Sequence, residues 1–173
     1  MGLIHIYCGD GKGKTTAALG LAVRAAGSGM KVHIVQLLKG SETSEINALK
    51  LIPNITVRRC DRDYGFTFNM SDENRRKLTA CHNDLLLQAE NLMSSGSIDM
   101  LIIDEFNAAY GCGLLDSDLA DRIVLHKPEQ TELVLTGRDP HRKFTEIADY
   151  ISEIKDVRHP YRAGIKARKG IEY

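Results

Sequence analysis

The sequence predicts a single α/β domain over residues 1–173, built on a mainly parallel sheet of about six strands with helices on both faces. Short apolar runs alternate with helix-like segments along the whole chain, which is the pattern of parallel strands joined by crossover helices. A length of 173 residues suits one domain. The hydrophobic fraction of 43% and charged fraction of 27% are ordinary for a globular protein, so a packed core is expected.

Charge and hydropathy argue against several classes of partner. Lys plus Arg and Asp plus Glu both number 23, so no net charge attracts nucleic acid or an anionic membrane. No apolar run approaches the roughly 20 residues of a membrane-spanning helix, and the short apolar start does not fit a signal peptide. The cysteines lie far apart, at Cys8, Cys60, Cys81 and Cys112. We therefore expect reduced thiols, without disulfides, in a cytoplasmic protein.

The first strand is expected at residues 3–8, and a glycine-rich loop follows it. The loop reads Gly9-Asp10-Gly11-Lys12-Gly13-Lys14-Thr15-Thr16, and a helix rich in Ala and Leu begins at its end. A strand, a loop and a helix in this order are the context of a phosphate-binding P-loop, in which backbone N–H groups and the helix N-terminus surround phosphate. The loop therefore predicts a P-loop NTPase (RecA-like) fold that binds a nucleoside triphosphate.

Individual loop residues have expected roles. Lys14 is placed to contact the outer phosphates, and the Thr15 hydroxyl is placed to ligate Mg²⁺. Lys12 adds a second cation suited to a long polyphosphate, with a solvated lysine as the alternative. Asp10 should point away from phosphate, toward a ribose or a backbone N–H. The spacing is atypical in one place, because Cys8 stands where the strict motif has glycine.

Two strands and two helices are expected in the next stretch. The strands lie at residues 32–38 and 55–59, the first of them apolar and rich in branched residues, with a short helix at 44–51 between them. Ser71 should cap a long helix that ends at Gly96. The helix then leads into a fourth strand.

The fourth strand is expected at residues 100–105, an apolar run that ends in Asp104 and Glu105. This is the pattern of a Walker B element, in which a carboxylate holds Mg²⁺ beside Thr15. An exposed acid pair at a strand end is the alternative. The sequence leaves open which of the two carboxylates would contact the ion.

The last part of the chain contains two further strands, expected at residues 133–136 and 150–154. A helix should begin at Asp116 or Ser117, and another at Asp139 as N-cap with Pro140 in the first turn. Arg138 follows the fifth strand, where a guanidinium can hold two phosphate oxygens. A surface arginine is the alternative reading of that position. The basic stretch at 159–173 has no clear periodicity.

Ligands of such sheets bind beyond the carboxyl ends of the strands. This rule brings the P-loop, Gln36 to Lys39, the Asp104–Glu105 pair and Gly137-Arg138 to one rim. Of these, we expect the P-loop, Gln36, the acidic pair and Arg138 to bind the nucleotide or its metal. No water-activating residue is visible there. The alternative function is a P-loop ATPase, kinase or nucleotide-dependent switch that cleaves the γ-phosphate.

The chain resembles a known family over essentially its whole length. The resemblance rests on residues 9–18, 35–40, 65–68 (Gly65-Phe66-Thr67-Phe68), 103–105, 133–138, 148–153, 159–161 and 164–173. The unusual loop spacing combined with the closing Gly170-Ile171-Glu172-Tyr173 is specific. On these motifs the sequence is similar to the P-loop type ATP:corrinoid adenosyltransferases, which act on cob(I)alamin or cob(I)yrinic acid a,c-diamide.

The resemblance implies transfer of the 5′-deoxyadenosyl group of ATP to the Co(I) of a reduced corrinoid, with release of triphosphate, in adenosylcobalamin biosynthesis or salvage. Cobalt would be the nucleophile, so the protein needs no residue to activate water. Lys12 and Lys14 would stabilise the leaving group together with Mg²⁺ on Thr15 and Glu105. Phe66 and Phe68 would face the lower side of the corrin. An electron donor such as a flavoprotein and a homodimeric assembly are also implied.

Overall fold

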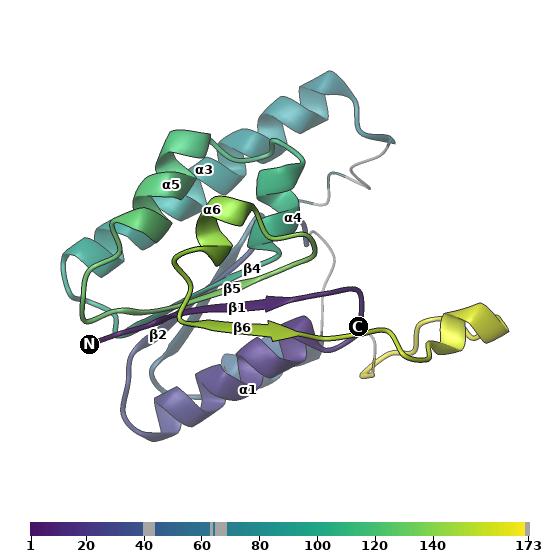
Figure 1. Ribbon diagram of the computed structural model, residues 1–173, viewed down its shortest axis with the longest axis horizontal. Helices are drawn as coiled ribbons and strands as arrows, with labels where there is room; N and C mark the ends of the chain where they lie inside the picture. Colours follow the sequence, from purple (N-terminus) through teal and green to yellow (C-terminus); the bar gives the residue numbers. More distant parts are fainter. Residues whose placement is uncertain (40–43, 63, 65–68, 172–173) are drawn as a thin grey trace.

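The computed structural model describes residues 1–39, 44–62, 64 and 69–171. Within these residues, six strands form one parallel sheet in the order β3-β2-β4-β5-β1-β6 (Figure 1). The strands are β1 (Ile4–Cys8), β2 (Val32–Gln36), β3 (Ile55–Arg59), β4 (Met100–Asp104), β5 (Glu132–Thr136) and β6 (Tyr150–Glu153). The predicted α/β fold is confirmed, and the strand β5 separates β1, which precedes the glycine-rich loop, from β4, which ends in Asp104.

Helices cover both faces of this sheet, as predicted. The helices are α1 (Lys14–Gly27), α2 (Ser44–Leu49), α3 (Asp72–Ser94), α4 (Phe106–Gly111), α5 (Ser117–Leu125) and α6 (Arg142–Thr145), followed by a 3₁₀ turn, η2 (Pro160–Ala163). Figure 1 shows α1 below the sheet, with α3, α5 and α6 above it. Among the described helices, none combines the length and the apolar composition that crossing a bilayer requires.

The sheet is buried because its central strands are apolar on both faces. All five residues of β2 and all five of β4 are buried, as expected for parallel strands that lie between two helical layers. Ile34, Ile102 and Val134 pack against α1 in one apolar cluster. A second cluster on the opposite face contains Leu101, Leu135 and the apolar side of α3.

Two predicted helix starts are confirmed by their capping hydrogen bonds. The Ser71 hydroxyl accepts a bond from the Asn74 amide, and α3 begins at the next residue. The Asp116 carboxylate accepts a bond from the Leu119 amide at the start of α5. Such caps satisfy amides that have no partner inside the helix, which is why short polar residues mark helix starts in a sequence.

The predicted helix start at Asp139 and Pro140 was wrong. The helix α6 begins at Arg142, and its N-cap is His141, whose Nδ1 accepts from the Lys143 amide. Asp139 has a φ of 49°, in the left-handed region, whereas an N-cap residue has an extended backbone. The chain therefore makes a turn after β5 before the helix begins.

The expectation that all cysteines are reduced and unpaired was also wrong. Cys60 and Cys81 form a disulfide, with their Cα atoms 6.1 Å apart. Cys60 follows β3, and Cys81 lies on α3 where this helix packs across the sheet, so the fold joins positions 21 residues apart in sequence. Cys8 and Cys112 are free, Cys8 buried and Cys112 exposed.

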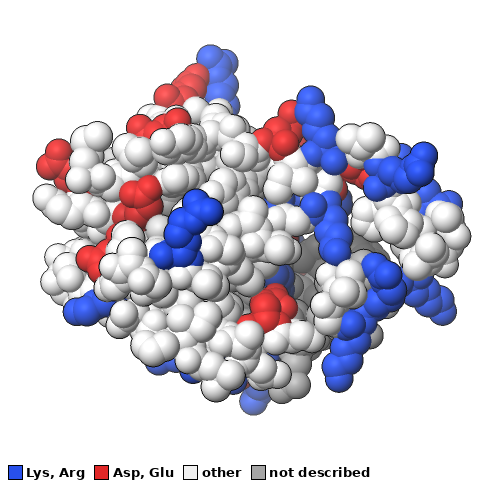
Figure 2. Space-filling model, turned by 90° about the horizontal axis from the view of Figure 1, so that it is seen from below, with Lys and Arg blue, Asp and Glu red and all other residues white. Residues whose placement is uncertain are grey.

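The segment after β6 extends beyond the sheet and then returns toward the P-loop (Figure 1). Its basic residues are exposed, and they are Lys155, Arg158, Arg162, Lys166, Arg168 and Lys169. Figure 2 shows Lys and Arg side chains gathered on the side of the molecule that carries this segment. This basic side lies next to the P-loop, because the Gly11 amide donates a 2.7 Å bond to the carbonyl of Ile154.

Candidate nucleotide site

The P-loop joins β1 to α1 and packs against the backbone after β6. Gly9 has a φ of 97°, and a Cβ atom there would lie 2.5 Å from the carbonyl oxygen of Ile154. Only glycine, which has no Cβ atom, adopts this φ readily and fits this close to the carbonyl oxygen. Cys8, by contrast, ends β1 and is 7% exposed within the core. The loop therefore needs its glycine one residue later than the strict motif, which accounts for the atypical spacing.

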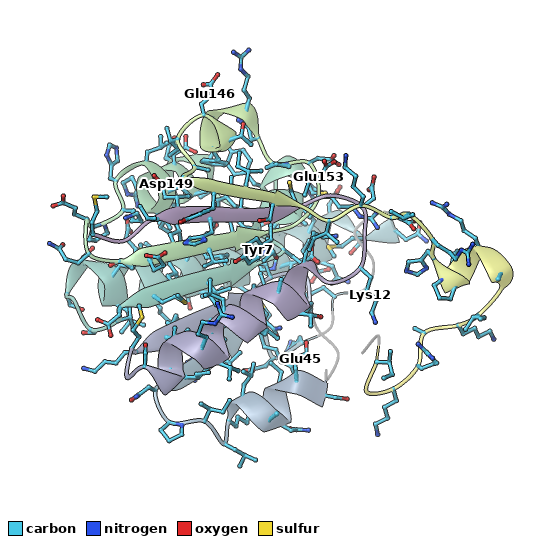
Figure 3. All side chains as sticks on the ribbon, turned by 60° about the horizontal axis from the view of Figure 1, so that its bottom comes forward. Tyr7, Lys12, Glu45, Glu146, Asp149 and Glu153 are labelled. Carbon is cyan, nitrogen blue, oxygen red and sulfur yellow. A yellow bond between two sulfur atoms is a disulfide. The ribbon has the colours of Figure 1, made fainter. Side chains whose placement is uncertain are left out.

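Lys14 is held inside the loop, at the first position of α1. Its ammonium group donates to the carbonyl oxygens of Gly9, at 2.7 Å, and Gly11, at 2.9 Å. These bonds fold the loop around the cation and fix it beside the N-terminus of α1, where the helix dipole also favours an anion. In Figure 3, Lys12 extends from the same loop on the side of the sheet that carries α1 and Glu45 of α2.

A buried carboxylate organises the floor of the site. Asp104, at the end of β4, is 0% exposed. Its Oδ1 accepts hydrogen bonds from the hydroxyl groups of Thr15, at 2.9 Å, and Thr136, at 2.7 Å, and its Oδ2 accepts from the Lys39 ammonium at 2.6 Å. We call these four residues, Thr15, Lys39, Asp104 and Thr136, the Asp104 cluster. A buried charge needs such partners, and removing one partner of a buried pair typically costs about 3–5 kcal/mol.

Glu105 follows directly and enters the cavity through an unusual backbone conformation. Its φ is 61°, in the left-handed region, and it caps α4. Its amide donates a 2.9 Å bond to the Thr136 hydroxyl, so Thr136 links Glu105 to Asp104. Burial raises the pKa of the Glu105 carboxyl, and the negative charge of Asp104 raises it further, while Lys39 and Lys14 lower it.

Lys39 reaches Asp104 because the chain turns sharply after β2. Leu38 has a φ of 56°, and its amide donates to Nε2 of His82 at 3.3 Å. His82 is fully buried, and burial lowers its pKa, so the neutral ring donates from Nδ1 to the Leu114 carbonyl and accepts at Nε2. A histidine on α3 thus holds the backbone from which Lys39 extends.

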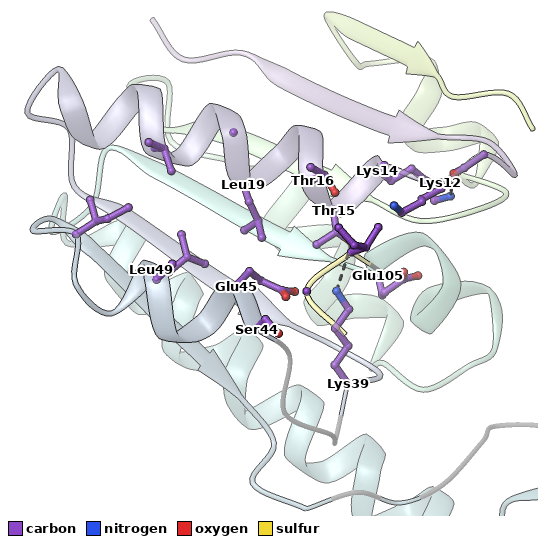
Figure 4. A pocket seen from close by; sticks show the side chains of 18 residues that line it. Lys12, Lys14, Thr15, Thr16, Leu19, Lys39, Ser44, Glu45, Leu49 and Glu105 are labelled. Carbon is purple, nitrogen blue, oxygen red and sulfur yellow. Dashed lines mark hydrogen bonds between the residues drawn. The ribbon is translucent and has the colours of Figure 1, made fainter. Parts of the chain in front are cut away.

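A cavity of about 740 Å³ lies above the Asp104 cluster. Its polar end is formed by the P-loop with Lys39 and Glu105, and its apolar wall by Leu19 and Val23 of α1 with Leu49 of α2 and Ile52 (Figure 4). Gly170 and Ile171 of the returning C-terminal segment complete the lining. The site therefore combines a cationic end with a wall suited to a flat apolar group.

A comparison with models of protein families matches the whole chain, residues 1–173, to the ATP:corrinoid adenosyltransferases BtuR/CobO/CobP. The chain belongs to this family. Among curated proteins it is 36% identical to the corrinoid adenosyltransferase of Escherichia coli, over 99% of this chain and 86% of that one. The identity is 34% to the corrinoid adenosyltransferase CobA of Salmonella typhimurium (99% and 86%) and 33% to the corrinoid adenosyltransferase of Pseudomonas aeruginosa (99% and 84%).

These comparisons decide between the two predicted functions. The chain is an enzyme of the adenosyltransferase class, with ATP and a corrinoid as the substrates that its family is named for. The resemblance on the P-loop and on the closing Gly-Ile-Glu-Tyr is confirmed by matches that extend over the whole length. The family is named for adenosyl transfer and not for cleavage of the γ-phosphate of ATP, so it does not support the alternative function.

Some of the predicted site residues that the structure describes do not line the cavity. Gln36 is 0% exposed beside Asp104, and its amide nitrogen and oxygen have no hydrogen-bond partner among the described residues. Arg138 and Asp10 are both exposed and face each other, with Nε 3.6 Å from Oδ1. Asp10 thus pairs with the Arg138 guanidinium, which was not the predicted partner. Phe66 and Phe68 lie outside the described residues.

Three residues that the structure brings to the candidate site or its support were not singled out from the sequence. Lys39 was predicted only as part of the rim, and Thr136 only as a strand residue. His82 was read as one more helical position of α3. A lysine shortly after one apolar strand and a threonine at the end of another were a signal for the first two. Nothing local in the sequence identifies His82, because its partners Leu38 and Leu114 are 44 and 32 residues away.

Proposed function

We propose that this adenosyltransferase binds MgATP with the triphosphate in the P-loop and transfers the 5′-deoxyadenosyl group to the Co(I) of cob(I)alamin or cob(I)yrinic acid a,c-diamide. A bond forms between cobalt and the 5′ carbon. The bond between that carbon and the α-phosphate oxygen breaks, and triphosphate leaves with the electron pair. Cobalt is oxidised from Co(I) to Co(III), so no external oxidant is needed.

One observation carries this proposal: Lys12, Lys14 and Lys39 line one cavity at the N-terminus of α1. Triphosphate is a highly charged leaving group, and cations aimed at developing negative charge are usually a large part of catalysis. Because the nucleophile is the cofactor's own metal, the chain has to position the nucleotide rather than activate a nucleophile. The lysines suit that task.

The donor set of the Asp104 cluster suits Mg²⁺. Magnesium prefers oxygen ligands and is commonly held by one or two protein carboxylates together with substrate phosphates. The Thr15 hydroxyl and the Asp104 carboxylate lie 2.9 Å apart, and Thr15 lines the cavity. The described part of the chain has no group of three or more His, Cys, Asp or Glu residues arranged to hold a metal ion. In the proposal, Thr15 and Asp104 hold the ion, Glu105 lies beside it, and the ion neutralises phosphate charge when bound.

The apolar wall of Leu19, Val23, Leu49 and Ile52 supports a place for the nucleoside or for the edge of the corrin. Phe66 and Phe68 are proposed to face the lower side of the corrin ring, on the strength of the motif that contains them. The proposal also includes a cytoplasmic enzyme, a homodimer, and an electron donor such as a flavoprotein that maintains Co(I).

Product identification tests this function. The protein is incubated with ATP, MgCl₂ and chemically reduced corrinoid, and both products are identified by chromatography and mass spectrometry. We expect an organocobalt product and inorganic triphosphate in equal amounts, and neither product when the corrinoid is omitted. ADP formed without corrinoid would contradict the proposal and favour γ-phosphate cleavage.

A further inference from the structure

The Lys39 ammonium lies between the two residues proposed to hold the metal. Its Nζ is 2.6 Å from Asp104 Oδ2 and 3.3 Å from Thr15 Oγ1. The Asp104 side chain is 0% exposed, whereas the Lys39 side chain is 21% exposed and lines the cavity. Figure 4 shows Lys39 extending toward Thr15, with the bond between them dashed. A protein cation thus contacts both oxygens that Mg²⁺ would need.

The Thr15 hydroxyl shows why the Lys39 ammonium and a magnesium ion would compete for the same position. A hydroxyl has one proton and two lone pairs, and Thr15 donates its proton to Asp104 Oδ1. Lys39 donates a hydrogen bond to the Thr15 hydroxyl oxygen from the cavity side. A magnesium ion bonded to Thr15 would lie about 2.1 Å from this oxygen, next to an ammonium that also contacts Asp104. The ion and the Lys39 ammonium would then lie close together, and two cations repel each other strongly in a buried site.

We propose that Lys39 is the resident cation of the metal position in the nucleotide-free enzyme, and that it exchanges with Mg²⁺ when MgATP binds. This inference rests on the metal site of the proposed function. After the exchange, Mg²⁺ lies against Thr15 and Asp104, and the Lys39 side chain turns within the same cavity to contact the triphosphate. A lysine suits this movement, because its charge is carried by a flexible four-carbon stem.

The backbone around Lys39 allows the side chain to move while the turn stays in place. The Leu37 amide donates to the Asp104 carbonyl at 3.1 Å, and the Leu38 amide is held by buried His82. Only the side chain of Lys39 must change its conformation. In the nucleotide-free enzyme, the same residue keeps Asp104 paired and the Thr15 hydroxyl oriented, so it positions the site before it contacts the leaving group.

The exchange predicts two opposite effects of removing the Lys39 charge. The metal position should become available to a divalent ion without nucleotide, because no internal cation competes for it. Binding of triphosphate should become weaker, because one of the cations in the cavity is lost. A purely structural role for Lys39 would not strengthen metal binding, so the first effect distinguishes the two roles.

The test compares Lys39→Met and Lys39→Gln with Lys77→Met as the matched control. Lys77 is an exposed residue of α3 paired with Glu73. Binding of Mn²⁺ alone, as a paramagnetic probe of the metal position, is measured by electron paramagnetic resonance, and binding of inorganic triphosphate with MgCl₂ by calorimetry. We expect Mn²⁺ alone to bind about tenfold more tightly to both Lys39 variants, and triphosphate about tenfold more weakly. Lys39→Arg should restore part of the triphosphate binding.

Mn²⁺ binding equal to that of the unmodified protein in both Lys39 variants would overturn the exchange. A Thr15→Val variant separates this failure from failure of the metal site. If Thr15→Val leaves Mg²⁺-dependent ATP binding unchanged, the metal site itself is wrong, and the exchange fails with it. If Thr15→Val weakens that binding while the Lys39 variants bind Mn²⁺ no better, only the exchange is wrong.

Discussion

The middles of β2, β4 and β5 and their carboxyl ends are equally buried, but the middles carry apolar side chains and the ends carry polar ones. Ile34, Ile102 and Val134 pack against α1 in an apolar cluster. Two residues further along each strand, on the same face because side chains alternate, come Gln36, Asp104 and Thr136. All six side chains are 0% exposed. Along each strand, the side chains on this face of the sheet therefore change from apolar core residues to polar residues of the candidate site within two positions.

This difference separates what holds the fold from what carries the function. Burying apolar side chains stabilises a protein, whereas burying polar groups costs free energy unless they are paired. Asp104 and Thr136 are hydrogen-bonded to residues that line the cavity. The side-chain amide of Gln36 has no hydrogen-bond partner in the part of the chain that the structure describes. We therefore expect substitutions at the strand ends to affect activity most, and substitutions in the strand middles to affect stability most.

The largest effect is expected at the P-loop, which lies beside the strand ends. Lys14→Ala should reduce adenosyl transfer about 10³-fold, because a cation next to the developing charge is lost. The midpoint of thermal unfolding should stay close to that of the unmodified protein. Steady-state rates and circular dichroism check both statements, with Lys77→Ala as the control. Near-normal turnover in Lys14→Ala would contradict the P-loop assignment.

A substitution in the strand middle should reverse this pattern. Ile102→Ala removes buried apolar atoms from β4 and should lower the free energy of unfolding by about 3 kcal/mol, within the range for such changes in a core. Urea unfolding measures this loss. At low temperature, where the variant stays folded, its turnover should remain within about twofold of normal. A large loss of turnover in the folded variant would show that core and site are coupled.

The buried histidine in the middle of β2 extends the comparison to a polar group outside the site. Burial lowers the pKa of His33 from 6.5 to about 4, so the unfolded chain binds a proton that the folded chain does not accept until the pH is lower. Stability conferred by the neutral ring is therefore present above pH 6.5 and is lost as the pH falls toward 4. We expect a loss of about 2 kcal/mol between pH 7 and pH 5.

Unfolding curves at several pH values check this loss, with His33→Val as the comparison. In the variant, this part of the pH dependence should disappear, leaving the share that the lowered pKa of buried His82 contributes in the same direction. Turnover at pH 7 should be unchanged. An identical pH dependence in both proteins would show that His33 is not the group that titrates.

The smallest loss in stability is expected at Thr136. Thr136→Val keeps the shape of the side chain but leaves the Glu105 amide without its partner and removes one bond to Asp104. We expect a loss of about 1 kcal/mol in stability and about a tenfold loss in turnover. Parallel measurements of unfolding and turnover check the two numbers. A loss in stability with normal turnover would assign Thr136 to the fold alone.

Features with a strong local signal were predicted from the sequence. The bounds of β3 and the capping of α3 by Ser71 were correct, because apolar periodicity and a polar cap are properties of neighbouring residues. The P-loop and the Asp104–Glu105 pair were placed at one rim, because parallel strands all end on the same side. Their roles in binding MgATP remain predictions.

Features that depend on distant contacts could not be predicted. The Cys60–Cys81 disulfide forms only because α3 packs across β3. The contact of Lys39 with Asp104 depends on a left-handed turn at Leu38 and on the hydrogen bond from the Leu38 amide to His82 of α3. The short helix α4 (Phe106–Gly111) was missed because its N-cap is Glu105, whose left-handed backbone has no marker in the sequence.

The bond that breaks in ATP tests the central claim most directly. ATP carrying a heavy-oxygen label in the bridge between its 5′ carbon and its α-phosphorus is turned over with reduced corrinoid, and the products are followed by phosphorus NMR. We predict that the label leaves in inorganic triphosphate, on a terminal phosphorus, and only when the corrinoid is present. Label retained in ADP, with free phosphate as the other product, would contradict the account.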